Sequence, residues 1–145
     1  MKAQEKKPRT VTAAVIERDG KILCARRKSG LAAGGLWEFP GGKLEEGEAA
    51  ERGLRRELEE ELGVEARVGE FLCSVPFSGS LMSFELIVFR AELLGDDFRL
   101  TDHDEIRWLG PEEMDESLFS KPDRPVVRML ARQAAPGDRT AGKPS

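Results

Sequence analysis

Apolar and polar residues alternate over several stretches of this chain, and that two-residue period predicts β-strands. The stretches are rich in Val, Ile, Leu and Phe, and turn-forming residues such as Gly, Pro and Asp separate them. Strands are therefore expected at Thr10–Arg18, Lys21–Arg27, Trp37–Phe39, Val64–Val75, Leu81–Leu93 and Ile106–Leu109. Asp19-Gly20 lies between the first two, which is typical of a tight hairpin turn.

A spacing of four residues replaces this alternation in the middle of the chain. Leu54, Leu58 and Leu62 recur every fourth residue, so their side chains share one face of a helix. We expect this helix to run from about Glu48 to Leu62. It should end at Gly63, because glycine readily takes the left-handed conformation that stops a helix.

The remaining segments complete a single domain. Pro111 is expected to open a short helical turn, and Pro125 a final helix that reaches about Ala134. Residues 1–9 are highly charged and residues 135–145 are rich in Pro, Gly and polar side chains, which predicts a flexible arm and a disordered tail. Strands and helices interleave irregularly over residues 10–134, which predicts an α+β fold.

Composition narrows the classes of function. The 145 residues carry a formal net charge of −4, which argues against a nucleic-acid polymer as partner, since that role needs a basic surface. No apolar run approaches the roughly 18 residues of a membrane span, and no signal peptide is visible, so we expect a cytoplasmic protein. Cys24 and Cys73 stand alone within apolar runs and are expected to be buried free thiols.

Three glutamates on the expected helix indicate a candidate cation site. Glu57, Glu60 and Glu61 lie three and four residues apart, so their side chains fall within an arc of roughly 100°. Two carboxylates about 4 Å apart near a surface repel by roughly 4 kcal/mol, and a hard divalent cation such as Mg²⁺ relieves that repulsion. The alternative is a solvated acidic helix whose glutamates pair with arginines at spacing four. Those arginines are Arg52, Arg55 and Arg56.

The segment around these glutamates resembles the Nudix box. That pattern runs Gly, five residues, Glu, seven residues, then Arg-Glu-aliphatic-any-Glu-Glu-any-Gly-aliphatic, and the chain meets every position. The matching residues are Gly42, Glu48, Arg56, Glu57, Leu58, Glu60, Glu61, Gly63 and Val64. The flanking segments AAVIERDGKILCARR, LWEFPGGK and DHDEIRWLGPEEM resemble the MutT-like branch of the family. The resemblance implies the Nudix α/β/α sandwich around a mixed β-sheet.

The resemblance also implies a role for each acid. Glu60 and Glu61 are expected to be the principal ligands of Mg²⁺, with Mn²⁺ as the alternative metal. Glu57 is expected to be a further ligand or the base that activates water, and the backbone carbonyl of Gly41 to join the ligands. The other box residues are expected to shape the loop and the helix. They are Gly42, Gly63 and the ion-paired Glu48 and Arg56.

One catalytic acid is expected outside the box. MutT-like enzymes supply a further metal-binding acid from a loop before a later strand. Alignment on Trp108 places Asp102 at this position, where a longer Glu is commoner. Glu105 lies close by and is the alternative.

The resemblance implies a small nucleotide as partner and substrate. MutT-like relatives cut nucleoside triphosphates to the monophosphate and pyrophosphate, and this chain is expected to clear a cytidine-type or oxidised nucleotide from the pool. Arg27 is the candidate phosphate contact, with an ordinary strand-end arginine as the alternative. Phe39 and Phe77 are candidates to border the base, although aromatic residues in strands are also typical of a core. Asp123 aligns with a base-reading position, and a turn residue between two prolines is its alternative. His103 is expected to be a strand-edge neighbour of the acid loop.

The sequence is also compatible with other functions. A Nudix hydrolase of another substrate such as ADP-ribose is one alternative, and a nucleotide-binding module without catalysis is another. The intact box argues against the second. The absence of Tyr argues against the diadenosine polyphosphate branch. Both a monomer and a homodimer are compatible with the sequence.

Overall fold

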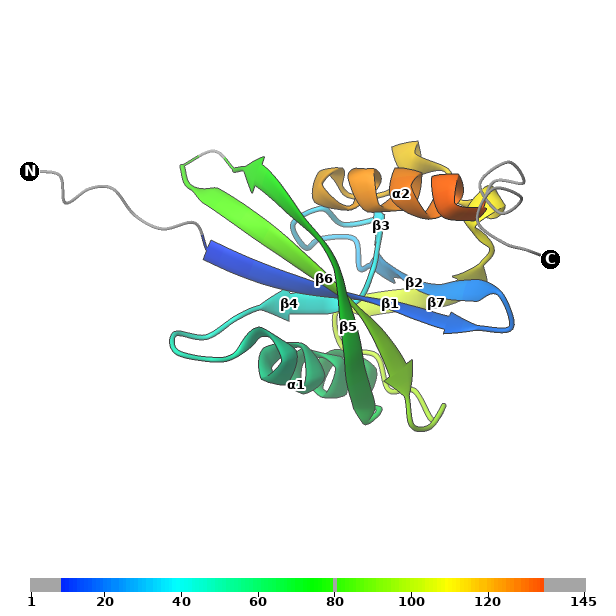
Figure 1. Ribbon diagram of the computed structural model, residues 1–145, viewed down its shortest axis with the longest axis horizontal. Coiled ribbons are helices and arrows are strands. Elements are labelled where there is room, and N and C mark those ends of the chain that lie inside the picture. The colour runs from blue at the N-terminus through cyan, green and yellow to red at the C-terminus, as the bar shows by residue number, and fades with distance from the viewer. Residues whose placement is uncertain (1–8, 80, 135–145) are drawn as a thin grey trace, which may run out of the picture. The chain divides into compact units, whose positions relative to one another are not determined.

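The computed structural model describes residues 9–79 and 81–134 (Figure 1). The expected flexible arm, apart from Arg9, and the expected disordered tail lie outside the described residues. The main elements are β1 (Arg9–Arg18), β2 (Lys21–Arg27), β3 (Trp37–Glu38), β4 (Gly41–Lys43), α1 (Ala50–Leu62), β5 (Ala66–Ser78), β6 (Ser83–Leu93), β7 (His103–Leu109) and α2 (Arg124–Ala134). Short 3-10 turns η2 (Pro111–Glu113), η3 (Glu116–Leu118) and η4 (Lys121–Asp123) precede α2. The chain groups into two compact units, one with residues up to 16 and 40–101, the other with residues 17–39 and those from 102 onward.

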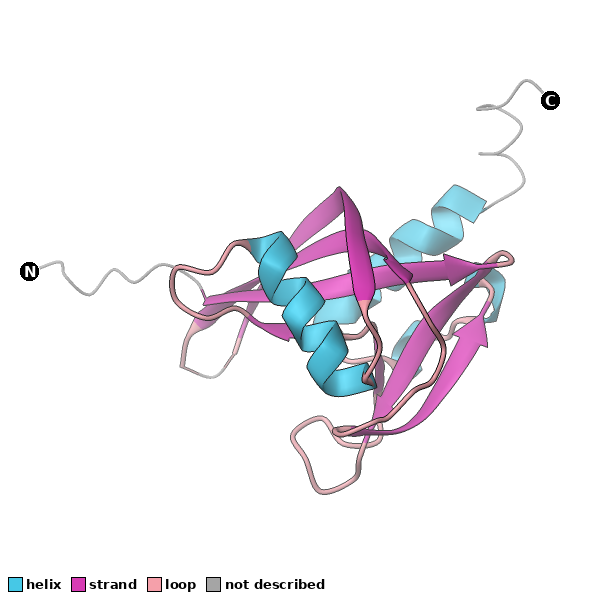
Figure 2. Ribbon diagram, turned by 90° about the horizontal axis from the view of Figure 1, so that it is seen from below, coloured by secondary structure: helices cyan, strands magenta, loops and turns pink. Residues whose placement is uncertain are grey.

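The first unit is a mixed sheet with a helix packed on it. β1 pairs in parallel with β6 and, on its other side, antiparallel with β4, while β6 pairs antiparallel with β5. Figure 2 shows α1 lying across the strands of this unit. The predicted leucine stripe faces the sheet, because Leu54, Leu58 and Leu62 are all fully buried. Strands of both directions combined with a packed helix confirm the α+β class with a mixed sheet.

Helix α1 begins at Ala50, two residues later than the predicted start at Glu48. Glu48 closes a turn instead. Its backbone N–H donates to the Glu45 carbonyl (3.0 Å), and its carboxylate accepts from the Glu45 N–H (2.9 Å). At the other end Gly63 takes the predicted left-handed conformation, with φ 72°, and its N–H donates to Glu59 (2.9 Å). Glu48 is therefore a residue of the preceding loop, and its side chain is aimed by that turn.

The second unit is built on β2, which pairs antiparallel with β3 on one side and β7 on the other. The predicted hairpin is present, since Asp19 and Gly20 have φ 52° and 78° and join the end of β1 to β2. Helix α2 buries an apolar face made of Val126, Val127 and Leu130. Neither α1 nor α2, the α-helices of the described residues, is long and apolar enough to span a membrane.

Strand β7 begins at His103, three residues before the predicted start at Ile106. The sequence there is polar, but the side chains still alternate. His103 is 1% exposed, whereas Asp104 is exposed and pairs with Arg26 on β2 (2.8 Å). Because the first residues of β7 are polar, hydrophobic alternation does not predict that the strand begins before Ile106.

The two cysteines are free thiols, as predicted. Cys24 is fully buried, and burial raises the pKa of its thiol to about 12. Cys73 is only half-buried, because it lies on β5, where no residue after Ala66 is buried. The expectation of complete burial therefore holds for Cys24 and is wrong for Cys73.

Candidate active site

Strand β4, which is not among the strands expected from the sequence, places the glycine-rich segment against α1. The N–H of Ala14 donates to the Pro40 carbonyl (2.8 Å), which sets the alternation of the ladder between β1 and β4. Every second residue of β4 then turns its backbone groups away from β1, and these are Gly41 and Lys43. The Lys43 carbonyl accepts from Arg56 Nη2 on α1 (3.3 Å). The Gly41 carbonyl therefore lies on the edge of β4 that faces α1.

Two glycines of β4 let neighbouring groups approach the strand closely. A Cβ at Gly41 would overlap the backbone of Thr12 on β1. A Cβ at Gly42 would overlap the carboxylate of Glu57 on α1. Glu57 thus lies directly against the backbone of β4 because position 42 has no side chain.

Arg56 gathers several acids of the box around one guanidinium. Its Nε and Nη2 bind the two carboxylate oxygens of Glu48 (2.8 and 2.9 Å), and its Nη1 contacts Glu57 (3.0 Å) and Glu60 (3.2 Å). Hydrogen bonding to Arg56 lowers the pKa of Glu48 to about 2, and hydrogen bonding to Glu48 raises the pKa of Arg56. The ion pair implied by the resemblance is present, and the same cation also bridges Glu57 and Glu60.

The three acids of α1 lie in different surroundings. Glu60 is exposed, Glu57 is mostly buried, and Glu61 is 8% exposed on the side of the helix that carries the leucines. Burial raises the pKa of Glu57, although Arg56 acts in the opposite direction. Within the described ranges, no three Asp, Glu, His or Cys side chains converge closely enough to hold a metal ion as they stand.

The donor chemistry of these groups nevertheless fits a hard divalent cation. The carboxylates of α1 and the Gly41 carbonyl are all oxygen donors, which Mg²⁺ and Mn²⁺ prefer. Arg56 Nη1 lies between Glu57 and Glu60, so these two carboxylates are already arranged around a positive charge.

The segment after β6 fastens the C-terminal end of α1. The N–H of Arg99 donates to the Leu62 carbonyl (2.8 Å), and the N–H of Thr101 to the Glu61 carbonyl (3.3 Å). The hydroxyl of Thr101 also approaches the Glu60 carbonyl (3.5 Å). These hydrogen bonds satisfy carbonyls at the C-terminal end of α1 and fix the backbone of Glu60 and Glu61.

The second unit contains both candidates for the metal-binding acid outside the Nudix box. These candidates, Asp102 and Glu105, have different partners. Glu105 is engaged twice, by Arg26 (3.3 Å) and by Arg107 (2.7 Å). Asp102 precedes β7, and its carbonyl accepts from the Lys28 N–H (3.0 Å). Asp102 is half-buried, and its carboxylate has no ion-pair partner in the part of the chain that the structure describes.

Arg27 ends β2 and is held by the loop that follows it. Its Nε donates to the Ala32 carbonyl (2.9 Å), and its Nη1 lies 3.6 Å from Glu38 Oε2. The same Glu38 oxygen is 2.8 Å from His103 Nε2. His103 is the first residue of β7 and directly follows Asp102, as expected, and its ring is a buried partner of Glu38.

Asp123 is a buried acid in η4. Its carboxylate accepts from the Ser120 hydroxyl (2.9 Å) and from the backbone N–H of Phe39. Burial, and then the nearby charge of Glu38, raise the pKa of Asp123 to about 7. Near neutral pH this carboxyl can therefore exist in either form, accepting hydrogen bonds when ionised and also donating one when protonated.

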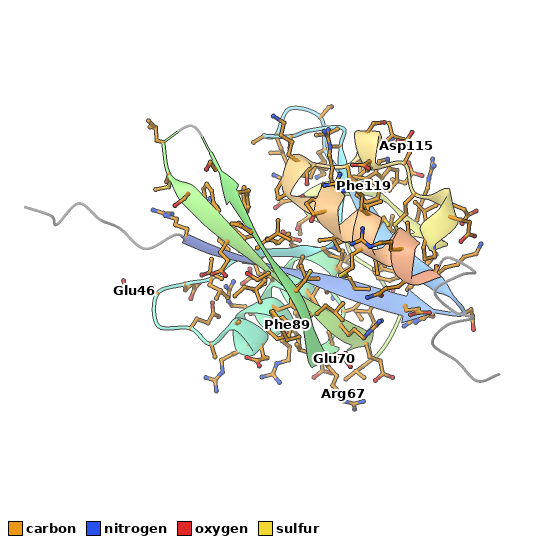
Figure 3. All side chains as sticks on the ribbon, turned by 45° about the horizontal axis from the view of Figure 1, so that its top comes forward. Glu46, Arg67, Glu70, Phe89, Asp115 and Phe119 are labelled. Carbon is orange, nitrogen blue, oxygen red and sulfur yellow. The ribbon has the colours of Figure 1, made fainter. Side chains whose placement is uncertain are left out.

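The two aromatic candidates have different surroundings. Phe39 is 3% exposed, and its ring packs on Phe119 with centroids 5.4 Å apart, so it belongs to the core of the second unit (Figure 3 labels Phe119). Phe77 lies on β5 in the first unit and stacks on Phe84 at 5.0 Å. It lines an open groove of about 620 Å³. The other lining residues are Ser74, Pro76, Ser78, Ser83, Phe84 and Glu85.

Two residues with clear structural roles were not singled out from the sequence. Gly53 is a glycine inside a strong helical pattern, and a Cβ there would overlap Leu44 and come within 2.9 Å of Glu48 Oε1. A glycine in a helix interior is itself a signal of such close packing. Glu38 gave no signal, because its partners His103 and Arg27 are distant in sequence.

Comparison with known proteins extends these observations. The family model described as NUDIX domain matches residues 6–130. The chain is 39% identical over 130 residues to the CTP pyrophosphohydrolase of Escherichia coli (strain K12), covering 88% of this chain and 96% of that protein. It is 34% identical over 129 residues to the putative 8-oxo-dGTP diphosphatase 2 of Mycobacterium tuberculosis, covering 84% and 87%. The solution structure of the E. coli ORF135 protein matches with a TM-score of 0.78 at 38% identity, covering 93% of this chain and 98% of that one. These likenesses confirm the expected sandwich fold.

Proposed function

The chain belongs to the NUDIX family of hydrolases acting on acid anhydrides, and we propose that it cleaves a nucleoside triphosphate to the monophosphate and pyrophosphate with Mg²⁺. The substrate we propose is a cytidine-type or oxidised nucleotide, which the enzyme would remove from the nucleotide pool. The main support for this proposal is that the edge of β4 carrying the Gly41 carbonyl faces α1, the helix that carries Glu57, Glu60 and Glu61. The names of the two relatives above support the substrate class.

Glu57, Glu60 and Glu61, together with the Gly41 carbonyl, would hold the cation. When bound, it neutralises phosphate oxygens and eases the loss of a proton from the attacking water. Glu57 and Glu60 would exchange their contact with Arg56 for the metal. Arg56 would stay in place through its two bonds to Glu48.

Glu57 also suits a group that accepts the proton of the attacking water. Its mostly buried carboxylate has a raised pKa, which brings it closer to the pH at which a general base works well. The absence of a side chain at Gly42 leaves space for the Glu57 carboxylate. Glu57 therefore serves as a further ligand or as the base, and positioning and electrostatics dominate the reaction in both cases.

Asp102 is the acid that we propose for the remaining catalytic and metal-binding role. Asp102→Asn should lower kcat/KM about a hundredfold, because a lost metal-binding carboxylate removes several kcal/mol of charge stabilisation. Glu105→Gln is the matched control and should stay within about threefold, since Glu105 is engaged by two arginines. Steady-state kinetics of pyrophosphate release measures both. A large loss in Glu105→Gln with none in Asp102→Asn would transfer the role to Glu105.

For the substrate, we propose Arg27 as a phosphate contact, and Phe77 and Asp123 as residues of the base side. Phe39 would contribute through the backbone N–H that it donates to Asp123. The deciding experiment is a panel of unmodified, methylated and oxidised ribo- and deoxyribonucleoside triphosphates plus ADP-ribose, compared by kcat/KM. The highest value is expected for a cytidine or oxidised nucleotide. Faster cleavage of ADP-ribose would contradict the substrate class, and tight binding without turnover at alkaline pH and millimolar Mg²⁺ would indicate a non-catalytic module.

Asp123 should also make stability depend on pH. Its pKa is raised from 3.8 to about 7, so between these values the native state holds a proton that the unfolded chain has lost. The contribution of Asp123 to the free energy of unfolding should therefore fall as pH rises from about 4 to 7 and level off above 7. The total change should be a few kcal/mol, at roughly 1.4 kcal/mol per pKa unit. Urea unfolding of wild type and Asp123→Asn at several pH values measures it. A difference between the two proteins that is constant with pH would contradict this expectation.

A further inference from the structure

Within the described residues, the His103 ring forms one hydrogen bond and leaves its other nitrogen without a partner. Its ring is buried, and Nε2 lies 2.8 Å from Glu38 Oε2. Because a carboxylate only accepts, Nε2 must carry the hydrogen. Nδ1 is buried without a hydrogen-bond partner among the described residues, which is energetically unfavourable. An apolar side chain would avoid this cost, so the imidazole is placed here for its bond to Glu38.

Glu38 is in turn held apart from Arg27. Arginine and carboxylate normally close a bidentate pair at hydrogen-bonding distance. This chain forms such a pair elsewhere, since Arg56 binds Glu48 at 2.8 and 2.9 Å. Between Arg27 Nη1 and Glu38 Oε2 the distance is 3.6 Å, too long for a hydrogen bond. The oxygen nearest to Arg27 is the one that His103 holds.

The Arg27 guanidinium is consequently oriented but not saturated. Its Nε is bonded to the Ala32 carbonyl, which fixes the plane of the group. In the described part of the chain, neither Nη1 nor Nη2 forms a hydrogen bond. A fixed guanidinium with unused donors suits a phosphate oxygen.

We propose that His103 is a positioning residue that restrains Glu38 from closing onto Arg27, which keeps the Arg27 donors available for a phosphate or pyrophosphate group. This inference rests on the proposed function, in which Arg27 contacts a substrate phosphate. The expected result of losing the restraint is a bidentate pair between Glu38 and Arg27 and weaker binding of the anion.

Inorganic pyrophosphate in the presence of EDTA is the probe, with its Kd measured by calorimetry, alongside KM and kcat for CTP. His103→Leu should raise the Kd and KM about tenfold and leave kcat within about twofold. His103→Gln retains a donor and should bind like wild type. His103→Leu combined with Glu38→Gln should recover tight binding, because an amide does not trap a guanidinium as a carboxylate does. Arg27→Ala is the reference for complete loss of the contact.

Recovery of pyrophosphate binding in the His103→Leu, Glu38→Gln double variant would show that His103 restrains Glu38 and does more than support the fold. If Glu38→Gln fails to restore binding in the His103→Leu background, the proposal is overturned. If His103→Leu does not fold, Glu38→Gln alone decides, since weaker pyrophosphate binding there would mean that Glu38 supports Arg27 instead of competing for it. Wild type that does not bind pyrophosphate also overturns the inference. The expected Kd pattern without nucleotide hydrolysis would support it and reject only the proposed function.

Discussion

Replacing Glu61 by Gln is expected to lower kcat/KM for pyrophosphate release about a thousandfold, and Glu60→Gln should have a similar effect. The amide keeps the shape of the side chain but removes the negative charge that would hold the cation, a loss of several kcal/mol in the transition state. Each 1.4 kcal/mol corresponds to a factor of ten in rate. The measurement is steady-state kinetics at saturating Mg²⁺, with the thermal midpoint of each variant recorded beside it.

A neighbouring glutamate provides the control for this experiment. Glu59 is exposed on the same helix and lies outside the invariant positions of the box, so Glu59→Gln should keep nearly full activity. Glu61 is buried, and the thermal midpoint shows whether Glu61→Gln acts through stability instead. Wild-type rates in both Glu60→Gln and Glu61→Gln would remove the metal site from α1.

Gly42→Ala is expected to lower kcat about a hundredfold while the protein stays folded. The added Cβ overlaps the carboxylate of Glu57, so that side chain has to turn away from β4. A misplaced catalytic group alone can cost about a hundredfold in rate. Gly69→Ala is the matched control, because a Cβ at Gly69 on β5 meets nothing closer than 3.4 Å. Both are measured by kcat and by the thermal midpoint.

A double variant tests whether Gly42 acts through Glu57. If it does, Gly42→Ala combined with Glu57→Gln should lose little more activity than Glu57→Gln alone, because the two changes disable the same group. Full additivity of the two losses would show that the glycine matters for another reason.

Local patterns were sufficient to predict most of the elements. The leucine spacing of α1, the turn at Asp19-Gly20 and the left-handed stop at Gly63 depend on residues close in sequence, and all three are present. The boundaries shifted where side chains bond to neighbouring backbone, as Glu48 does at the start of α1.

What could not be predicted depends on contacts between distant segments. β4 pairs with β1 where Gly41 lies close to the backbone of Thr12, Gly42 leaves room for Glu57 of α1, and no hydrophobic pattern marks this strand. The pair of Glu38 and His103 joins residues 65 positions apart. The sequence places three acids on one arc, but the packing of α1 decides that Glu61 is buried and Glu60 exposed. The box therefore identifies the acids without specifying their environments.

Phosphorus NMR of the wild-type protein with CTP and with 8-oxo-dGTP tests directly whether α1 and β4 form a metal-dependent site that cleaves a diphosphate linkage. With Mg²⁺, we expect the nucleoside monophosphate and pyrophosphate signals to grow equally for at least one of the two nucleotides, and neither signal to grow after EDTA is added. Release of orthophosphate with a nucleoside diphosphate, or cleavage that continues unchanged in EDTA, would contradict this expectation.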